Sequence, residues 1–386
     1  MGVWDELTGQ ADAIEVFSAA AGSGNADSSM THSWLITGPP GSGRSNIAYA
    51  FAAALLSNGV DDEATQRQVA ARTHPDLGVL ATERVIITME EVRKLVSTSQ
   101  FSPSVGRYRV MVIEDADRMV ERTSNVLLKA LEEPPPRTVW ILCAPSEADL
   151  IPTIRSRVRS VRLRVPAVAE VADLISRRDG VDLETATRAA RESQSHIGMA
   201  HRLATNNEAR SRRAQTLQVA LAIRSVSDAV RAAGKLLELA GDDAKAYTAE
   251  RDAEERTSAM RSLGVEPGGT IPPQLRAQLR NLEEDQKRRA TRSLRDGIDR
   301  IMVDLLSLYR DILLMQLGAN TELVNLSIHS ELVSASRRST AAATLGTMDA
   351  ISTARRRIES NVSPALALEA MLISAAGLKP AAHNSH

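Results

Sequence analysis

The spacing Gly38-x-x-x-x-Gly43-Arg44-Ser45 is typical of a phosphate-binding loop. Glycines at these places let the backbone wrap around a phosphate, so that several N–H groups point inward, and the N-terminus of the next helix adds positive potential. Ser45 would hold the Mg²⁺ that accompanies a nucleotide. The residues of this loop that we expect to contact ATP or ADP are Gly38, Gly41, Ser42, Gly43, Arg44 and Ser45.

Arg44 stands where this loop normally has a lysine. Lysine is a compact point charge that reaches the β and γ phosphates, whereas arginine is a longer planar fork. We therefore expect ATP hydrolysis to be impaired or absent, which leaves binding of ATP or ADP open. Two simpler interpretations remain: a glycine-rich turn without a nucleotide, or drift to arginine in a chain that has only six lysines.

A second element with potential chemistry is the apolar run Arg109–Ile113, followed by Glu114 and Asp115. A Walker-B-type strand delivers one carboxylate to Mg²⁺ and a neighbouring one to water, usually in the order Asp then Glu. The order is reversed here, which displaces each carboxylate by about 1 Å and can reduce the rate about a hundredfold. If a nucleotide is bound, Ser45 and Glu114 are the expected Mg²⁺ ligands. Acids that merely end a strand are the alternative.

The elements that must position these residues alternate along the chain, which favours an α/β fold with a parallel, doubly wound sheet. The segments expected to form strands, the second together with a turn, are His32–Thr37, Val79–Thr88, Arg109–Asp115 and Thr138–Ala144. Those with helical spacing are Trp4–Ala21 after a short lead-in, Asn46–Leu56, Met89–Gln100 and Ser124–Leu131.

The pattern changes at Pro166, which suggests three domains. We expect a nucleotide-binding-like domain at 1–165, a small helical lid at 166–208 and an all-helical domain at 209–386. The last domain should contain a flexible insert near 262–292, since Gly264–Pro273 holds three glycines and three prolines. The charge-mixed stretch after this loop predicts an exposed helix.

Composition limits the classes of function. The 386 residues are 43% hydrophobic and 25% charged with a formal net charge of -1, so the whole molecule is not an electrostatic nucleic-acid binder. Cys143 is the only cysteine, which excludes an internal disulfide and a cysteine-rich zinc site. There is no secretory pattern and no apolar run near twenty residues, so we expect a cytoplasmic protein without a membrane segment.

Four motifs together resemble bacterial clamp-loader subunits of the AAA+ class, the gamma/tau and delta-prime group. They are His32–Gly43, Thr73-His-Pro-Asp76, Asn125–Pro136 and Pro152–Arg157, and the resemblance covers about residues 1 to 210. It implies an AAA+ P-loop sheet with a helical lid, followed by an all-α collar domain. It also implies the clamp-loader partners: the gamma/tau and delta subunits, the sliding clamp, and primer–template DNA through the assembled complex of a bacterial replisome.

The resemblance also implies roles for single residues. Val3 and the segment Thr8-Gly9-Gln10 are similar to the segment that lines the adenine pocket. Ser156-Arg157 is similar to a Ser-Arg-Cys element whose arginine acts in trans, as a finger on ATP in the neighbouring subunit; Val158 replaces the cysteine. His201 stands where a sensor-2 arginine is expected.

Two further family features are altered. Ser146 is a weak candidate for sensor 1. The four cysteines that hold a structural zinc in many relatives have no counterpart in Ser57–Arg72, so no zinc is expected.

Features that serve hydrolysis in the chain's own pocket are altered, whereas Arg157 is retained. We therefore expect a non-catalytic or weakly hydrolytic accessory subunit that supplies Arg157 as a catalytic residue to its neighbour. The alternatives are an active ATPase of gamma/tau type, which turns over ATP alone, and an AAA+ DNA-remodelling helicase, which displaces strands without partners. Arg157 itself has a plainer interpretation as one arginine of a basic run with Arg155, Arg159, Arg162 and Arg164.

Overall fold

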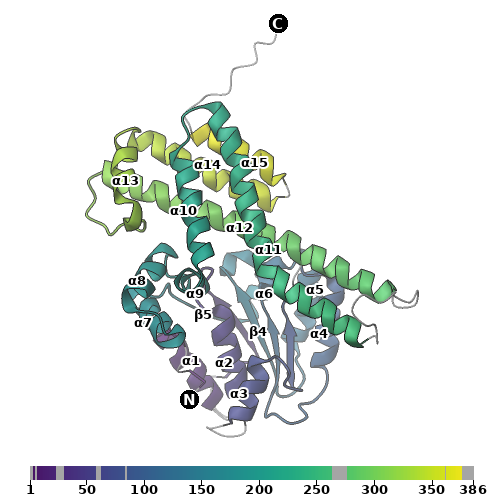
Figure 1. Ribbon diagram of the computed structural model, residues 1–386. Coiled ribbons are helices and arrows are strands. Elements are labelled where there is room, and N and C mark those ends of the chain that lie inside the picture. Colours follow the sequence, from purple (N-terminus) through teal and green to yellow (C-terminus); the bar gives the residue numbers. More distant parts are fainter. Residues whose placement is uncertain are drawn as a thin grey trace. The chain divides into compact units, whose positions relative to one another are not determined.

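The chain folds into two compact units, Met1–Thr205 and Asn206–His386, each described here by itself (Figure 1). The computed structural model describes residues 3–4, 7–22, 30–57, 62–82, 85–262, 276–360 and 362–375. The division lies close to the expected boundary at 208, and the separate boundary at 165 stays a prediction. The glycine- and proline-rich stretch Gly264–Pro273 lies outside the described residues.

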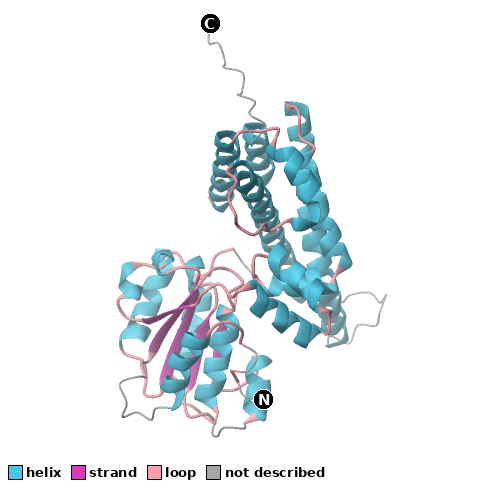
Figure 2. Cartoon of the chain, turned by 90° about the vertical axis from the view of Figure 1, so that its left-hand side faces the viewer, coloured by secondary structure: helices cyan, strands magenta, loops and turns pink. Residues whose placement is uncertain are grey.

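A five-stranded parallel sheet forms the centre of the first unit, shown in magenta in Figure 2. Its order is β2-β3-β4-β1-β5, so the chain crosses over between neighbours as a doubly wound sheet requires. Ser33 of β1 lies opposite Trp140 of β4. The strands are β1 (Ser33–Thr37), β2 (Leu77–Leu80), β3 (Arg109–Ile113), β4 (Thr138–Ala144) and β5 (Arg159–Arg162).

Helices cover both faces of this sheet, as expected. On one face, Phe17, Trp34 and Phe51 pack together with ring centroids 4.6–5.3 Å apart, and Cys143 of β4 is buried in the same core. This face carries α1 (Ala11–Gly22), α2 (Arg44–Leu56) and α3 (Glu63–Ala70). The opposite face carries α4 (Met89–Ser99), α5 (Glu121–Glu132) and the short α6 (Pro152–Arg155).

The predictions for the two edge strands need correction. The strand expected within Val79–Thr88 runs from Leu77 to Leu80, and Ile87 makes only an isolated bridge to Met119. The strand β5 was not anticipated at all, because its basic side chains are exposed and only Val161 is buried. An edge strand of this kind lacks the apolar run that identifies a buried one.

Three helices of the described chain complete the first unit and occupy the region expected to form a lid. They are α7 (Val168–Asp179), α8 (Leu183–Glu192) and α9 (Ile197–Thr205). Gly180 ends α7 with φ 68°, a left-handed conformation that suits glycine. The turn before α9 contains Gln194 and Ser195, both with positive φ.

The described residues of the second unit form helices and connecting loops and no strand, which confirms the expected all-α region. Its core is built from Ala, Leu and Ile of long helices, including Ile298, Leu305 and Ile312 of the helical repeat seen in the sequence. The helices are α10 (Asn207–Leu221), α11 (Val226–Ser262), α12 (Arg276–Gln316), α13 (His329–Ser336), α14 (Ala341–Glu359) and α15 (Pro364–Ala375). None of the described helices, in either unit, is long and apolar enough to span a membrane.

A buried polar cluster fixes the register of these helices. The Arg213 guanidinium donates to Asp304 at 3.0 Å and to the Asn325 side chain at 2.6 Å. Asp311 is fully buried and accepts from the Asn325 N–H at 2.7 Å and from the Val324 N–H at 3.1 Å. Buried polar groups are costly unless paired, so the connection after α12 can adopt few other arrangements.

Candidate nucleotide site and arginine finger

The phosphate loop keeps the backbone conformation that its glycines predict. Gly41 and Gly43 have φ of 81° and 89°, which residues with a Cβ rarely adopt. Gly43 is the N-cap of α2, so the first N–H groups of that helix face the loop. The backbone is therefore suited to an anion, as the sequence indicated.

Arg44 turns back onto its own loop. Its Nη1 donates to the Gly38 carbonyl at 2.7 Å. A lysine that serves a nucleotide must extend toward the β and γ phosphates. The Arg44 guanidinium is instead bonded to a carbonyl of the loop that should direct it toward the phosphates.

Glu114 is the centre of an internal cluster, which the sequence did not predict. Ser45 donates to its Oε2 at 2.9 Å, Tyr49 donates to its Oε1 at 2.5 Å, and Arg72 forms an ion pair with Oε1 at 2.9 Å. The Arg72 guanidinium also lies 5.1 Å from the centroid of the Tyr49 ring. Burial, and then the hydrogen bond to Glu114, raise the pKa of Tyr49 well above its usual range.

Arg72 competes for Glu114 with the Mg²⁺ that a nucleotide would bring. Oε1 of Glu114, an expected ligand, is already engaged by the Tyr49 hydroxyl and by Arg72, and the Arg72 guanidinium supplies a positive charge to the carboxylate. Mg²⁺ demands near-ideal octahedral oxygen geometry. A cation that binds Glu114 must therefore compete with the positive charge of Arg72.

The second acid of the pair is turned away from the catalytic arrangement. Asp115 has φ 50° and pairs with Arg118 at 3.4 Å, so it lies beyond the end of β3 rather than within the strand. Asp117, which the sequence interpretation overlooked, is half-buried, and burial followed by the nearby Asp115 charge raises its pKa. Both acids follow the end of β3, so neither is a carboxylate held within the strand.

The lid segment lies directly on the phosphate loop through His196. The Ile197 N–H donates to the Gly41 carbonyl at 3.3 Å, and a Cβ at Gly41 would come within 2.2 Å of the His196 ring. His201, the residue weighed as a sensor, bonds Asp179 at 2.7 Å instead. The sequence interpretation missed His196, although its place just before an expected helix was visible.

The segment compared with an adenine pocket is also tightly packed. Gln10 donates to the Ser42 carbonyl at 3.2 Å and to the Arg164 carbonyl at 2.9 Å, so it joins the loop to the end of β5. Gly9 has φ 73°, and a Cβ there would lie 2.9 Å from both Pro166 and Glu170. Val3 packs, partly buried, against the same core.

Arg157 lies in the turn between α6 and β5, outside this cluster. Its Nε donates to Glu132 at 2.6 Å, and Nη2 contacts the same carboxylate oxygen. Nη1 donates to the Thr153 carbonyl at 2.7 Å and to the Ser156 hydroxyl at 3.1 Å. The Arg157 side chain is 33% exposed, so it is accessible from outside the chain.

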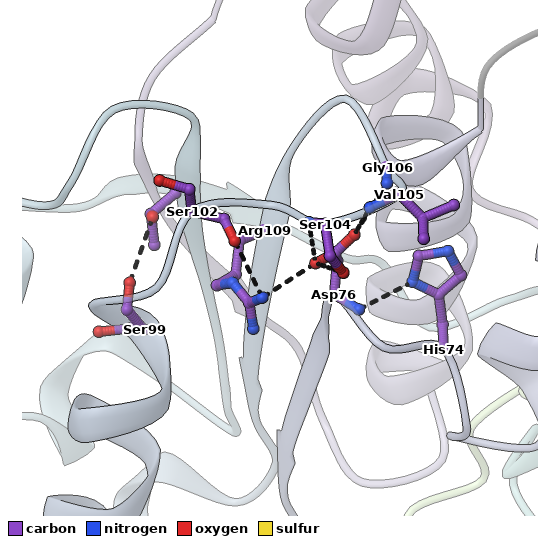
Figure 3. Close-up of polar contacts among 9 residues, drawn as sticks. His74, Asp76, Ser99, Ser102, Ser104, Val105, Gly106 and Arg109 are labelled. Carbon is purple, nitrogen blue, oxygen red and sulfur yellow. Dashed lines mark hydrogen bonds and ion pairs between the residues drawn. The ribbon is translucent and has the colours of Figure 1, made fainter.

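The Thr-His-Pro-Asp motif forms a structural anchor, shown in Figure 3. The buried Asp76 carboxylate accepts the N–H groups of Ser104, Val105 and Gly106 at 2.7–2.8 Å and pairs with Arg109 at 2.9 Å. Burial opposes the charge of Asp76, but these hydrogen bonds outweigh it and hold its pKa below the ordinary value. The motif thus fixes the loop before β3.

A phosphate loop between β1 and α2, a carboxylate pair after β3 and a helical lid after β5 together define a P-loop domain of the AAA+ class. Within that class, the comparisons confirm the resemblance to delta' subunits of bacterial DNA polymerase III. Residues 9–167 match the family described as "DNA polymerase III, delta subunit".

Two relatives illustrate the extent of the match. The delta' subunit of Pseudomonas aeruginosa is 34% identical over 154 residues, which cover 38% of this chain and 47% of that protein. The Escherichia coli delta' subunit is 29% identical over 177 residues, covering 44% and 53%. The matches thus span about half the length of these relatives. A gamma subunit-related protein of Thermotoga maritima superposes with a TM-score of 0.44 at 17% identity, over 97% of this chain and 100% of that one.

Proposed function

We propose that this chain is a non-hydrolysing, delta'-type subunit of a bacterial clamp loader. In this proposal it joins gamma/tau and delta subunits and supplies Arg157 to ATP bound in a neighbouring gamma/tau subunit. The assembled complex would open the sliding clamp and place it on primed DNA.

The observation that carries the proposal is the internal pairing of the chain's own pocket. Arg44 bonds Gly38, and Glu114 bonds Ser45, Tyr49 and Arg72. Groups that would serve Mg²⁺-ATP are therefore held by the protein itself. The finger element supports the other half of the proposal, because Arg157 remains partly exposed in a surface turn.

The test is Arg157→Ala in a complex reconstituted with gamma/tau and delta. An arginine finger contributes about 10³- to 10⁵-fold in rate at the site it serves. We expect turnover at the receiving site to fall by at least about 10³-fold, and clamp- and DNA-stimulated ATPase of the complex to fall with it. The measurement is steady-state phosphate release with complex formation checked by gel filtration.

Arg155→Ala is the matched control, since Arg155 is an exposed arginine two positions away. It should leave the stimulated turnover nearly unchanged. Equal activity of the Arg157→Ala and unsubstituted complexes would refute the finger. Rapid ATP turnover by the isolated chain would instead favour an active ATPase of gamma/tau type.

A further inference from the structure

The Arg157 guanidinium contacts three residues of its own chain. Nε and Nη2 contact the Glu132 carboxylate, and Nη1 donates to Thr153 and Ser156. The edge formed by Nε and Nη2 is one that a phosphate uses when it binds arginine in two-pronged fashion. Glu132 therefore occupies an anion-binding edge of the finger.

A carboxylate is unusual at the position of Glu132 in its helix. It is the last residue of α5, before the prolines that follow Glu133. The C-terminus of a helix carries partial negative charge, so an acid there is unfavourable unless a cation compensates it. Helix stability alone therefore does not explain an acid at this position, whereas the Arg157 contact does.

We propose that Glu132 masks the arginine finger: its carboxylate stands in for a phosphate and holds Arg157 until a neighbour's triphosphate displaces it. The inference rests on the proposed function, because it assigns a regulator to the same arginine. A correctly placed triphosphate carries more negative charge than one carboxylate and therefore displaces Glu132 from Arg157. A misplaced triphosphate does not displace Glu132, so the finger acts only in an aligned complex.

The exposure of the pair makes such an exchange feasible. The Arg157 and Glu132 side chains are 33% and 45% exposed. Water screens a pair of this kind, so its strength corresponds to a factor of roughly two to five in the masked population. That is enough to limit activity in a poorly aligned complex and small enough for ATP to overcome.

The experiment is Glu132→Gln in the reconstituted complex, with ATP turnover measured both without and with clamp and primed DNA. Glutamine keeps the size and removes the charge. We expect the unstimulated rate to rise roughly two- to fivefold and the stimulated rate to change little, so the stimulation ratio falls. Glu133→Gln makes the same charge change one residue further on and should leave both rates unchanged.

Two outcomes would overturn the mask. A fall of the rate toward that of Arg157→Ala would mean that Glu132 orients the finger, and unchanged rates would mean that the pair has no role. The double variant Glu132→Gln/Arg157→Ala must show no gain, because the mask acts only through the finger. If Arg157→Ala alone has no effect, the proposed function fails first. Thermal unfolding of each variant controls for loss of folding.

Discussion

The phosphate-loop pocket and the Arg157 turn belong to the same unit, yet they hold their charges differently. In the pocket, Glu114 is largely buried and bonds side chains from α2 and from the turn after α3. At the turn, Arg157 is paired with one acid at the surface. Buried charges depend on their partners for stability, whereas exposed pairs are weak and exchangeable. The comparison supports our proposal that the chain's own pocket has become structural while Arg157 remains available to a neighbour.

Among the structural carboxylates described above, the fully buried Asp76 should contribute most to the stability of the fold. Asp76→Asn should lower the free energy of unfolding by about 3–5 kcal/mol, because it leaves Arg109 buried without its partner. Urea unfolding at neutral pH measures this. A loss below about 1 kcal/mol would show that the anchor is not structural.

The same variant makes a prediction about pH. The pKa of Asp76 is lower in the folded protein than its ordinary value of 3.8, so its stabilising contribution is complete above that value. The contribution is lost as the pH falls through the folded pKa. The difference between Asp76→Asn and the unsubstituted chain should therefore shrink in acid, which unfolding curves from pH 7 down to about 3 would reveal.

Glu114→Gln tests the pocket half of the comparison directly. Removal of its charge leaves Arg72 without its ionic partner, but the Arg72 side chain is 49% exposed and water replaces much of the pair, so the cost should be about 1 kcal/mol in the isolated chain. The stimulated ATPase of the complex should stay nearly unchanged, the opposite of the expectation for Arg157→Ala. A stable Glu114→Gln chain that gives an inactive complex would reverse the assignment of the two regions.

Arg44→Lys should have the smallest effect. It restores the usual loop residue but leaves Glu114 bonded to Tyr49 and Arg72, so ATP turnover by the isolated chain should not rise measurably. Phosphate release at high protein concentration is the measurement. Turnover restored by this single change would show that Arg44 alone had silenced the pocket.

Much of the fold could be predicted from local pattern. The apolar runs of β1, β3 and β4 are buried on every residue, so the sequence pattern and the structure coincide there. The failure at β5 has a physical cause: an edge strand with exposed arginines carries too few apolar side chains to be recognised. The end of β3 before Glu114 was misplaced because the positive φ of Asp115 leaves no mark in the sequence.

The site was predicted in its residues but not in its contacts. The loop glycines and Ser45 follow a fixed spacing, and Glu114 follows a recognisable strand. Tyr49 lies four residues after Ser45 on α2, a spacing that places both residues on one face of the helix. Arg72 and His196 reach the pocket only through tertiary packing, which no spacing rule encodes. Glu132 lies within the motif Asn125–Pro136, but its partner Arg157 lies 25 residues further along the chain, so the sequence did not reveal the contact.

Cys143 in β4 has a practical consequence. It is the chain's only cysteine, it is 2% exposed, and burial raises the pKa of its thiol. An enclosed, protonated thiol reacts slowly with alkylating reagents. A cysteine introduced at the exposed Arg155 would then be the one position that takes up a maleimide dye, so fluorescence could follow docking of a neighbour without an engineered cysteine-free background.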